Sequence, residues 1–419
     1  EPLGLVKMDL LGVRSLSIIT DCLQSAKSLY QSLKGNGNTS STSVFRYDVK
    51  RCALHKEDLH TYLTAQKFPF LDIAREHLSP LDLRVIPEND SNVIALLRNG
   101  LSMGCFQTES PAMRGLLKKM QIEGMDDVIT AVALIRPGAA DSGMKDAYIE
   151  RRAGLKKVEY IHSSLKSLLE ETYGGIVYQE QVMQVAVEVA GFSLSQADVL
   201  RRAMTKSRDH KTLSGLQKLF IDGATQKGLS KPQANQIWQF LNNFVGYGFN
   251  KAHACTYGVI AYQTAFLKYY FPVQYMTAVL NNQGGFYSRA AYIAEARRMG
   301  IRLLPPDINR SAKEFTLRND TIFTGLDCVY ELTEKSTERI LKERSKSPFG
   351  DYYDFMQRVQ PRQKEVENLI KCGALRSLQP NEPHLLLKNK LYFRNKRNRN
   401  LTESLLQQVR LKPYNVYQR

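Results

Sequence analysis

Apolar residues spaced three and four apart dominate the chain between residues 92 and 272, and this spacing constrains the fold more than any other feature. It recurs over residues 125–135, 179–190 and 237–244, as expected when each helix buries one face. Gly and Pro punctuate the pattern between these segments. We therefore predict a mostly α protein with minor β structure.

The composition favours an anionic partner. The 419 residues allow two or three domains, and 58 Lys and Arg against 41 Asp and Glu give a net charge of +17. This balance indicates nucleic acid first and a membrane surface second, with a merely basic protein as the alternative. The six cysteines form no C-x-x-C pair, and the sequence has no long apolar run or signal peptide. We expect a cytoplasmic protein that makes no membrane contact.

Two adjacent arginines, Arg201 and Arg202, follow a segment that resembles a capping box, Ser195 to Asp198. This pattern places both arginines in the first two turns of a helix. Neighbouring helical positions point about 100° apart, so the two guanidinium groups can straddle one anion, and the planar Arg fork suits phosphate. The alternative is a pair of solvated surface arginines, the commoner role of an Arg–Arg dipeptide.

A second cationic cluster lies in the segment Gly-Tyr-Gly-Phe-Asn-Lys-Ala-His-Ala over residues 246–254. A helix predicted over 251–270 begins with Lys251, and the free N–H groups of a helix start attract anions. His253 could donate a hydrogen bond to a phosphate. The alternative for His253 is a hydrogen-bonded histidine in the core.

Asp9 is the best candidate metal ligand. It lies on a strand predicted over residues 3–10, with Lys7 on the same face. A carboxylate there suits Mg²⁺, and Lys7 would offset phosphate charge. A two-metal site needs further carboxylates, which the sequence does not supply at a convincing position. Asp126 and Asp127 indicate a helix N-terminus instead.

Several stretches resemble, in their order and residue identities, the sequence motifs of the bacterial family-C DNA polymerases. This family comprises the replicative DNA polymerase III alpha subunit and its error-prone relatives. The matching stretches cover residues 4–12, 106–110, 136–138, 172–183, 197–204, 246–254 and 304–309. The resemblance implies a DNA-directed DNA polymerase that uses primer–template DNA and deoxynucleoside triphosphates. It also implies a sliding clamp and replisome subunits as partners of the intact enzyme.

The resemblance also assigns roles to the candidate residues. Asp9 resembles the last of three catalytic aspartates that hold Mg²⁺, and Lys7 its companion on the triphosphate side. Arg201 and Arg202 resemble the fingers arginines that bind the incoming triphosphate. Lys251 and His253 fall in the segment that lines the same pocket.

The implied organisation has six parts. They are the end of the palm over 1–33, a loop and candidate insertion over 34–83, the fingers over 84–272, a connecting region over 273–323, a degenerate tandem helix-hairpin-helix module over 324–380 and a basic tail over 381–419. We expect helical pieces between residues 44 and 83. The tail is expected to be a solvated or disordered arm, with DNA contact as the secondary interpretation.

The first hairpin of the helix-hairpin-helix module departs from the family pattern. Residues 327–331, Asp-Cys-Val-Tyr-Glu, stand where a glycine-containing hairpin is expected. Without glycine, the backbone approaches a phosphate less easily, so this hairpin is a weak candidate for gripping DNA.

Two alternative functions remain open. One is a non-catalytic nucleic-acid-binding protein derived from polymerase fingers, which a start codon just before Glu1 would favour. The other is an error-prone polymerase, which residues 281–287 resemble weakly.

The resemblance places two further catalytic aspartates before residue 1, so we interpret the chain as a polymerase fragment. We predict that the 419-residue chain with Mg²⁺ and all four nucleotides gives no primer extension, because a lone aspartate cannot hold two metals. Extension of a labelled primer would contradict this prediction.

Overall fold

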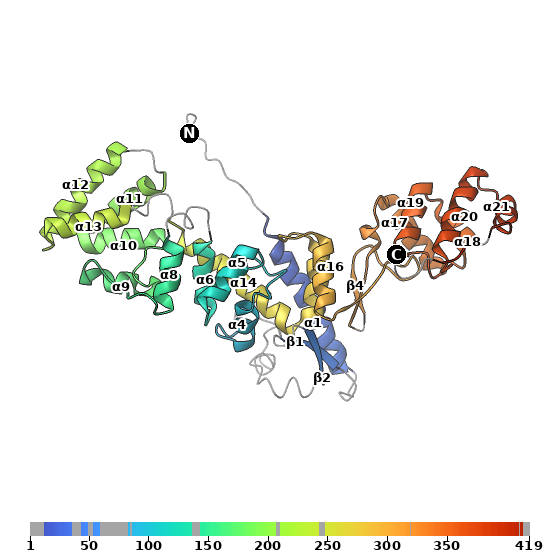
Figure 1. Ribbon diagram of the computed structural model, residues 1–419, viewed down its shortest axis with the longest axis horizontal. Coiled ribbons are helices and arrows are strands. Elements are labelled where there is room, and N and C mark those ends of the chain that lie inside the picture. The colour runs from blue at the N-terminus through green and yellow to red at the C-terminus, as the bar shows by residue number, and fades with distance from the viewer. Residues whose placement is uncertain are drawn as a thin grey trace. The chain divides into compact units, whose positions relative to one another are not determined.

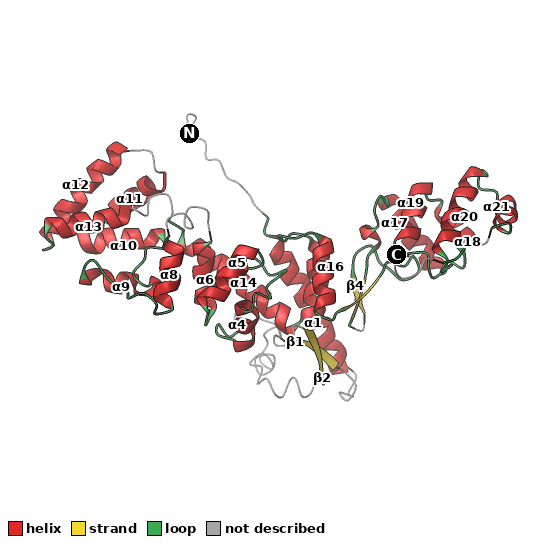
Figure 2. Cartoon of the chain, viewed as in Figure 1, coloured by secondary structure: helices red, strands yellow, loops and turns green. Residues whose placement is uncertain are grey.

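The structure is a computed structural model that describes residues 12–35, 43–48, 53–58, 83, 86–135, 143–206, 210–242, 248–318, 320–409 and 411–413. The chain forms two compact units. Unit 1 comprises residues 1–67 and 270–419, and unit 2 comprises residues 68–269. Helices account for most of both units and strands for little, which confirms the predicted fold class (Figure 2).

The described residues of unit 2 form helices joined by loops and turns, with one isolated β-bridge and no strand (Figure 1). Its α-helices are α4 (Ser91–Arg98), α5 (Pro111–Met120), α6 (Met125–Leu134), α8 (Met144–Arg152), α9 (Lys166–Leu169), α10 (Gln179–Ala190), α11 (Leu194–Lys206), α12 (His210–Gln226), α13 (Lys231–Asn242) and α14 (Lys251–Tyr270). Short 3-10 turns, η4 (Ser163–Leu165) and η5 (Glu170–Thr172), flank α9.

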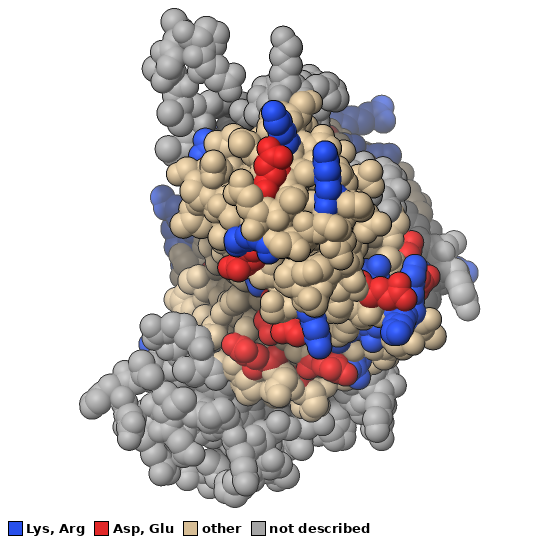
Figure 3. All heavy atoms as spheres, turned by 90° about the vertical axis from the view of Figure 1, so that its left-hand side faces the viewer, with Lys and Arg blue, Asp and Glu red and all other residues tan. Residues whose placement is uncertain are grey.

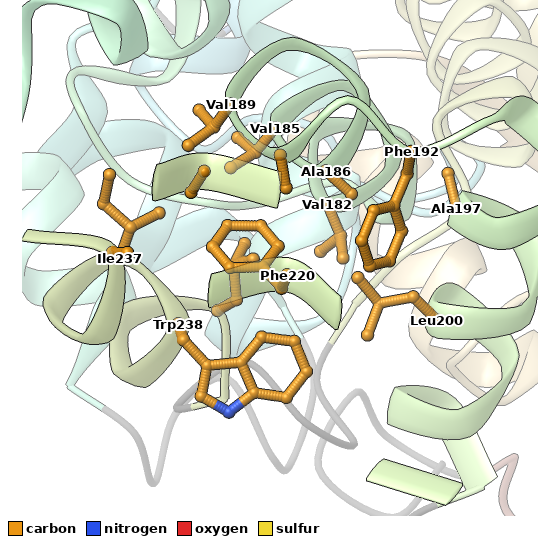
Figure 4. Close-up of a cluster of buried hydrophobic side chains, with 14 of the residues drawn as sticks. Val182, Val185, Ala186, Val189, Phe192, Ala197, Leu200, Phe220, Ile237 and Trp238 are labelled. Carbon is orange, nitrogen blue, oxygen red and sulfur yellow. The ribbon is translucent and has the colours of Figure 1, made fainter. Parts of the chain in front are cut away.

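Helices α10 to α13 share one apolar core. Phe220 of α12 lies at its centre, with its ring centroid 6.1 Å from that of Phe192 and 5.5 Å from that of Trp238 (Figure 4). Val185 of α10 and Leu200 of α11 are fully buried in the same cluster. The spacing of these apolar residues along each helix is what places α11 firmly on α10 and α12.

Helix α14 anchors the segment that follows α4. The Lys268 side chain is fully buried, and its Nζ donates to the carbonyls of Leu101 and Met103 at 2.7 Å each. The Phe106 amide donates to Thr264 Oγ1 at 3.1 Å. The stretch over 101–106 therefore has a structural task, because its backbone groups bond the buried polar side chains of Lys268 and Thr264 in α14.

Unit 1 begins with α1 (Arg14–Gly35), which packs along α15 (Pro272–Asn282), and α15 in turn contacts α16 (Arg289–Arg298). Strands β1 (Ser43–Asp48) and β2 (Ala53–Asp58) pair antiparallel. The prediction of helical pieces here is wrong for these strands. The β-branched and aromatic residues of the Val-Phe-Arg-Tyr run favour a strand.

A small sheet and a helical cluster complete unit 1. The sheet has the order β3-β5-β4, with β3 (Arg302–Leu304) parallel and β4 (Thr316–Arg318) antiparallel to β5 (Thr321–Phe323). After the short turn η6 (Leu326–Cys328) come α17 (Glu334–Lys346), α18 (Tyr352–Val359), α19 (Gln363–Lys371), α20 (Glu382–Arg394) and α21 (Arg399–Leu406).

The expectation of a solvated or disordered tail is wrong for residues 382–406, which form α20 and α21. Helix α20 packs on α19, and α21 packs on α20. Leu385 and Tyr392, seven residues apart, are buried in the same core as Tyr352 and Leu369. The high content of Lys and Arg obscures this apolar spacing in the sequence.

The hairpin before α17 keeps the backbone conformation that glycine favours, although it has no glycine. Glu331 has φ 57°, in the left-handed region. The amide of Thr333 donates to Glu365 Oε1 at 3.0 Å, and its hydroxyl donates to the same atom at 2.6 Å. Burial by itself would raise the pKa of Glu365, but the hydrogen bonds from Thr333 and from the Arg362 amide outweigh it, so the pKa lies below its usual value. The Glu365 carboxylate of the same module therefore already accepts the hydrogen bond of the Thr333 amide.

Among the described residues, no helix has the length and apolar character needed to cross a membrane.

The close contact between α10 and α12 yields a stability prediction. A Cβ on Gly223 would lie 2.1 Å from the carbonyl oxygen of Ala190. We expect Gly223→Ala to destabilise the chain by about 1–3 kcal/mol, because the two helices must separate. Chemical denaturation followed by circular dichroism measures the change.

Gly215 on the same helix is the matched control, since a Cβ there meets nothing within 4 Å. Gly215→Ala should be neutral or stabilising by up to about 1 kcal/mol, from helix propensity alone. Equal effects of the two substitutions would contradict the packing argument.

Candidate functional site

Gln179, the first residue of α10, joins the two cationic segments singled out in the sequence. Its Oε1 accepts from Arg201 Nη1 of α11 at 3.0 Å, and its Nε2 donates to the Gly248 carbonyl at 2.9 Å. Its amide also donates to the Phe249 carbonyl at 2.9 Å. One side chain therefore fixes Arg201 beside the segment that enters α14.

The arginine pair shares one carboxylate. Arg201 Nε and Nη2 donate to Asp198 Oδ1 at 2.9 and 2.8 Å, and Arg202 Nη2 lies 2.6 Å from Asp198 Oδ2. The hydrogen bond from Arg201, followed by that from Arg202, lowers the pKa of the Asp198 carboxyl. Arg202 remains 68% exposed and Arg201 28% exposed.

The predicted helix start before these arginines is wrong. The capping box is Ser193 with Gln196, whose side chains accept each other's backbone amides at 3.2 and 2.9 Å. Helix α11 therefore begins earlier than predicted, and the arginines lie in its interior rather than at its entrance. Asp198 is therefore not a cap. It is the ion-pair partner of Arg201 at i, i+3 and of Arg202 at i, i+4.

The entrance of α14 is built on Glu180. Its Oε2 accepts from the Lys251 amide and its Oε1 from Asn250 Nδ2, both at 2.9 Å. Lys251 Nζ forms an ion pair with Glu171 at 2.8 Å and lies 5.2 Å from the centroid of the Tyr178 ring. The helix begins at Lys251, as predicted, and its ammonium is half-exposed.

His253 is exposed, which excludes the alternative of a core histidine. Its amide donates to Asn250 Oδ1 at 2.8 Å, so Asn250 caps the helix. The His253 ring lies against Tyr257, with centroids 4.0 Å apart, and near Phe249 at 5.3 Å. The imidazole is thus oriented by aromatic neighbours while its edge stays accessible to solvent.

Several predicted residues lie outside the described part of the chain. They are Lys7, Asp9, the glycine at 246 and the stretch 136–138. No cluster of His, Cys, Asp or Glu among the described residues has the arrangement of a metal site. Asp198 and Glu180 are engaged by guanidinium groups and a helix start, so these two carboxylates do not fit a magnesium ion.

Asp127 has the structural role predicted from its position. It lies in the first turn of α6 and accepts two hydrogen bonds from Arg152, at 2.5 and 2.7 Å. The N-cap itself is Gly124, so Asp127 stabilises the helix start without being its cap.

Charges on one face of unit 2 are mixed. Figure 3 faces the side that carries α12 and α13 in Figure 1, and there Lys and Arg side chains alternate with Asp and Glu on a largely uncharged surface. The described residues on this face therefore form no broad basic field.

Gln179, Glu180 and Asp198 were not recognised as site residues from the sequence. Gln179 and Glu180 gave no local signal, because their partners lie between 22 and 71 residues away in the sequence.

The amino-acid sequence matches two family profiles. The profile of the bacterial DNA polymerase III alpha subunit finger domain matches residues 69–228, and that of the helix-hairpin-helix motif matches residues 300–385.

Curated relatives named DNA polymerase III subunit alpha are similar over most of the chain. The Campylobacter jejuni protein is 41% identical over 69% of this chain and 25% of its own length. The Bacillus subtilis protein is 34% identical over 92% of this chain and 30% of its length, and the Thermus aquaticus protein 37% over 79% and 28%. The chain thus spans less than a third of these relatives.

The cap on α14 can be tested without reference to function. Glu180→Ala removes the acceptor of the Lys251 amide, so we expect a loss of about 0.5–2 kcal/mol and faster hydrogen exchange over residues 250–255. Glu188, exposed on the same helix, is the control, and Glu188→Ala should stay within about 0.5 kcal/mol of the wild type. Unchanged exchange in Glu180→Ala would exclude the capping role.

Proposed function

Because the chain belongs to the family of bacterial DNA polymerase III alpha subunits, we propose that unit 2 binds the triphosphate of an incoming deoxynucleoside triphosphate during template-directed DNA synthesis. The observation that carries this proposal is the Gln179 bridge, which joins Arg201 to the segment entering α14. The bridge links two segments that are far apart in the sequence, which supports a proposed phosphate-binding group of Arg201, Arg202, Lys251 and His253.

The cations are preorganised by weak, exposed ion pairs. Arg202 and Lys251 are 68% and 39% exposed, and among the described residues Arg202 pairs with Asp198 and Lys251 with Glu171. Exposed pairs of this kind contribute about 0–1 kcal/mol, so a triphosphate with several charges can displace them. The carboxylates hold the side chains in place until the phosphate arrives.

In the reaction we propose, the primer 3′-hydroxyl attacks the alpha-phosphate of the nucleotide, a new P–O bond forms, and the bond to the beta-phosphate breaks to release pyrophosphate. Negative charge accumulates on the leaving pyrophosphate. Arg201, Arg202 and Lys251 stabilise that charge, and His253 donates a hydrogen bond to it. Lys7 is assigned to the same triphosphate by resemblance.

Asp9 is proposed as the magnesium ligand of this chain. It lies outside the described residues, and Mg²⁺ would supply charge stabilisation at the phosphates when bound. The described carboxylates around Gln179 contribute no metal ligand to the proposal.

Primer–template DNA is the proposed macromolecular partner. The helix-hairpin-helix match over residues 300–385 supports contact with the duplex. A sliding clamp and replisome subunits are proposed as partners of the polymerase in which this sequence acts.

Removing the most exposed arginine tests nucleotide binding. We expect Arg202→Gln to weaken the binding of dATP to the 419-residue chain about tenfold or more, since a charge-assisted contact to phosphate contributes about 1.5–3 kcal/mol. Isothermal titration calorimetry measures the Kd. Lys157→Gln, at an exposed residue of the same unit, is the matched control and should bind as the wild type does. Equal affinity of Arg202→Gln and the wild type, or no binding by the wild type, would refute the proposed site.

Removing the competing carboxylate should have the opposite effect. Asp198→Asn keeps the Oδ1 acceptor that restrains Arg201 but removes the negative charge that competes with phosphate, so tripolyphosphate should bind up to about fivefold more tightly. Asp222→Asn, at an exposed residue of α12, is the control for net charge. If the two variants change the Kd equally, Asp198 is not a competitor for these arginines.

A further inference from the structure

Helices α20 and α21 place their lysines and arginines in two different environments. Lys388 is 11% exposed, pairs with Glu403 at 2.8 Å, and lies 4.7 Å from the Tyr353 ring centroid. The next four cations, Lys390, Arg394, Lys396 and Arg397, are exposed. The first therefore belongs to the packing of the module. The other four are exposed and have no described ion-pair partner, although Arg397 also lies 5.3 Å from the Phe393 ring centroid.

The exposed cations lie in a segment without acidic residues. Residues 383–402 contain six Lys or Arg and no Asp or Glu. Among the described carboxylates, none forms an ion pair with the four exposed cations. Glu367 already forms an ion pair with Lys371 at 2.8 Å. The hydrogen bond from Lys371 lowers the pKa of Glu367, and the charge of Lys390 contributes to the same shift. The positive charge here is consequently uncompensated, unlike that of Arg201 and Lys251 in unit 2.

The turn between the two helices is held in a fixed conformation. Lys396 and Arg397 have φ 48° and 65°, and the Arg397 amide donates to the Tyr392 carbonyl at 2.7 Å. Asn395 Nδ2 donates to Thr402 Oγ1 at 3.4 Å, and Arg399 lies 4.7 Å from the Tyr353 ring centroid. Two successive left-handed residues other than glycine persist only where the surrounding contacts impose them. The cations of the turn therefore project from an ordered backbone rather than from a disordered arm.

We propose that Lys390, Arg394, Lys396 and Arg397 form a contact surface for the phosphate backbone of duplex DNA, separate from the first hairpin of the helix-hairpin-helix module. The four residues are called the α20 basic surface below. The proposal deepens the proposed DNA-directed function by naming where the duplex backbone is held.

Geometry and charge favour a duplex as the ligand. Lys390 and Arg394 are one helical turn apart, about 6 Å along α20, and the turn extends the row beyond the helix end. Duplex DNA presents one negative charge per about 1.7 Å of its axis, so a row of this length faces several phosphates at once. Exposed lysines and arginines without an ion-pair partner can bind DNA phosphates without first breaking an ion pair within the protein. Their binding releases counterions from the DNA.

A membrane surface is the less suitable partner. Amphipathic helices bind bilayers through an exposed apolar face. In α20, by contrast, no large apolar residue is exposed, and Leu385 and Tyr392 are buried in the core at 1% and 8% exposure. Helix α20 therefore carries positive charge that would attract an anionic membrane, but it has no exposed apolar face to insert into the bilayer.

The test compares the salt dependence of DNA binding in matched variants of the 419-residue chain. Fluorescence anisotropy with a short labelled duplex gives the Kd at several NaCl concentrations. We expect the variant Lys390→Gln, Arg394→Gln, Lys396→Gln and Arg397→Gln to bind at least tenfold more weakly. Its slope of log affinity against log salt should be shallower by about three to four, close to 0.9 for each lost phosphate contact.

The control variant removes the same charge from exposed residues of unit 2, as Lys118→Gln, Lys119→Gln, Lys156→Gln and Lys157→Gln. Its slope should stay near that of the wild type. The proposal is overturned if both variants change the slope equally, if neither does, or if the wild type binds phosphatidylserine vesicles but no duplex. Circular dichroism checks that both variants are folded. Calorimetry with dATP separates this outcome from a failure of the nucleotide site, because that site lies in unit 2.

Discussion

The candidate site depends on one amide side chain. Gln179 accepts from Arg201 and donates to Gly248, so a single residue sets the position of a helix-interior arginine relative to the start of another helix. Glutamine suits this task because it donates and accepts at the same time without adding charge. A glutamate at this position would pair with Arg201 but lose the donor that holds the Gly248 carbonyl.

Around this bridge, each described side chain that we assign to phosphate binding is either paired or oriented by a neighbour. Asp198 and Glu171 restrain Arg201, Arg202 and Lys251, and Tyr257 orients His253. Long cationic side chains lose much conformational freedom when they bind a ligand, and prior restraint reduces that entropic cost. The site is thus preorganised for phosphate rather than strongly positive in electrostatic potential before a ligand binds. The face that carries α12 and α13 likewise has mixed rather than uniformly positive charge among its described residues (Figure 3).

Helical spacing made much of unit 2 predictable, and overlapping local signals account for most of the errors. The bounds of α14 follow from a buried apolar pattern that ends before a proline. The start of α11 was wrong because two polar patterns overlap, one at Ser193 with Gln196 and one at Ser195 with Asp198. Only tertiary contacts decide between them. The role of Gln179 could not be predicted, since its partners lie 22 and 69 residues away.

The carboxylate of Glu365 has a consequence for how this module can recognise a duplex. Because the Thr333 amide already donates to Glu365, this main-chain donor is not free to bind a phosphate. Main-chain donors demand a phosphate at one fixed position, whereas lysine and arginine tolerate variation in groove width and bending. The duplex contact that we propose for the α20 basic surface would therefore depend on the charge density of DNA more than on its shape.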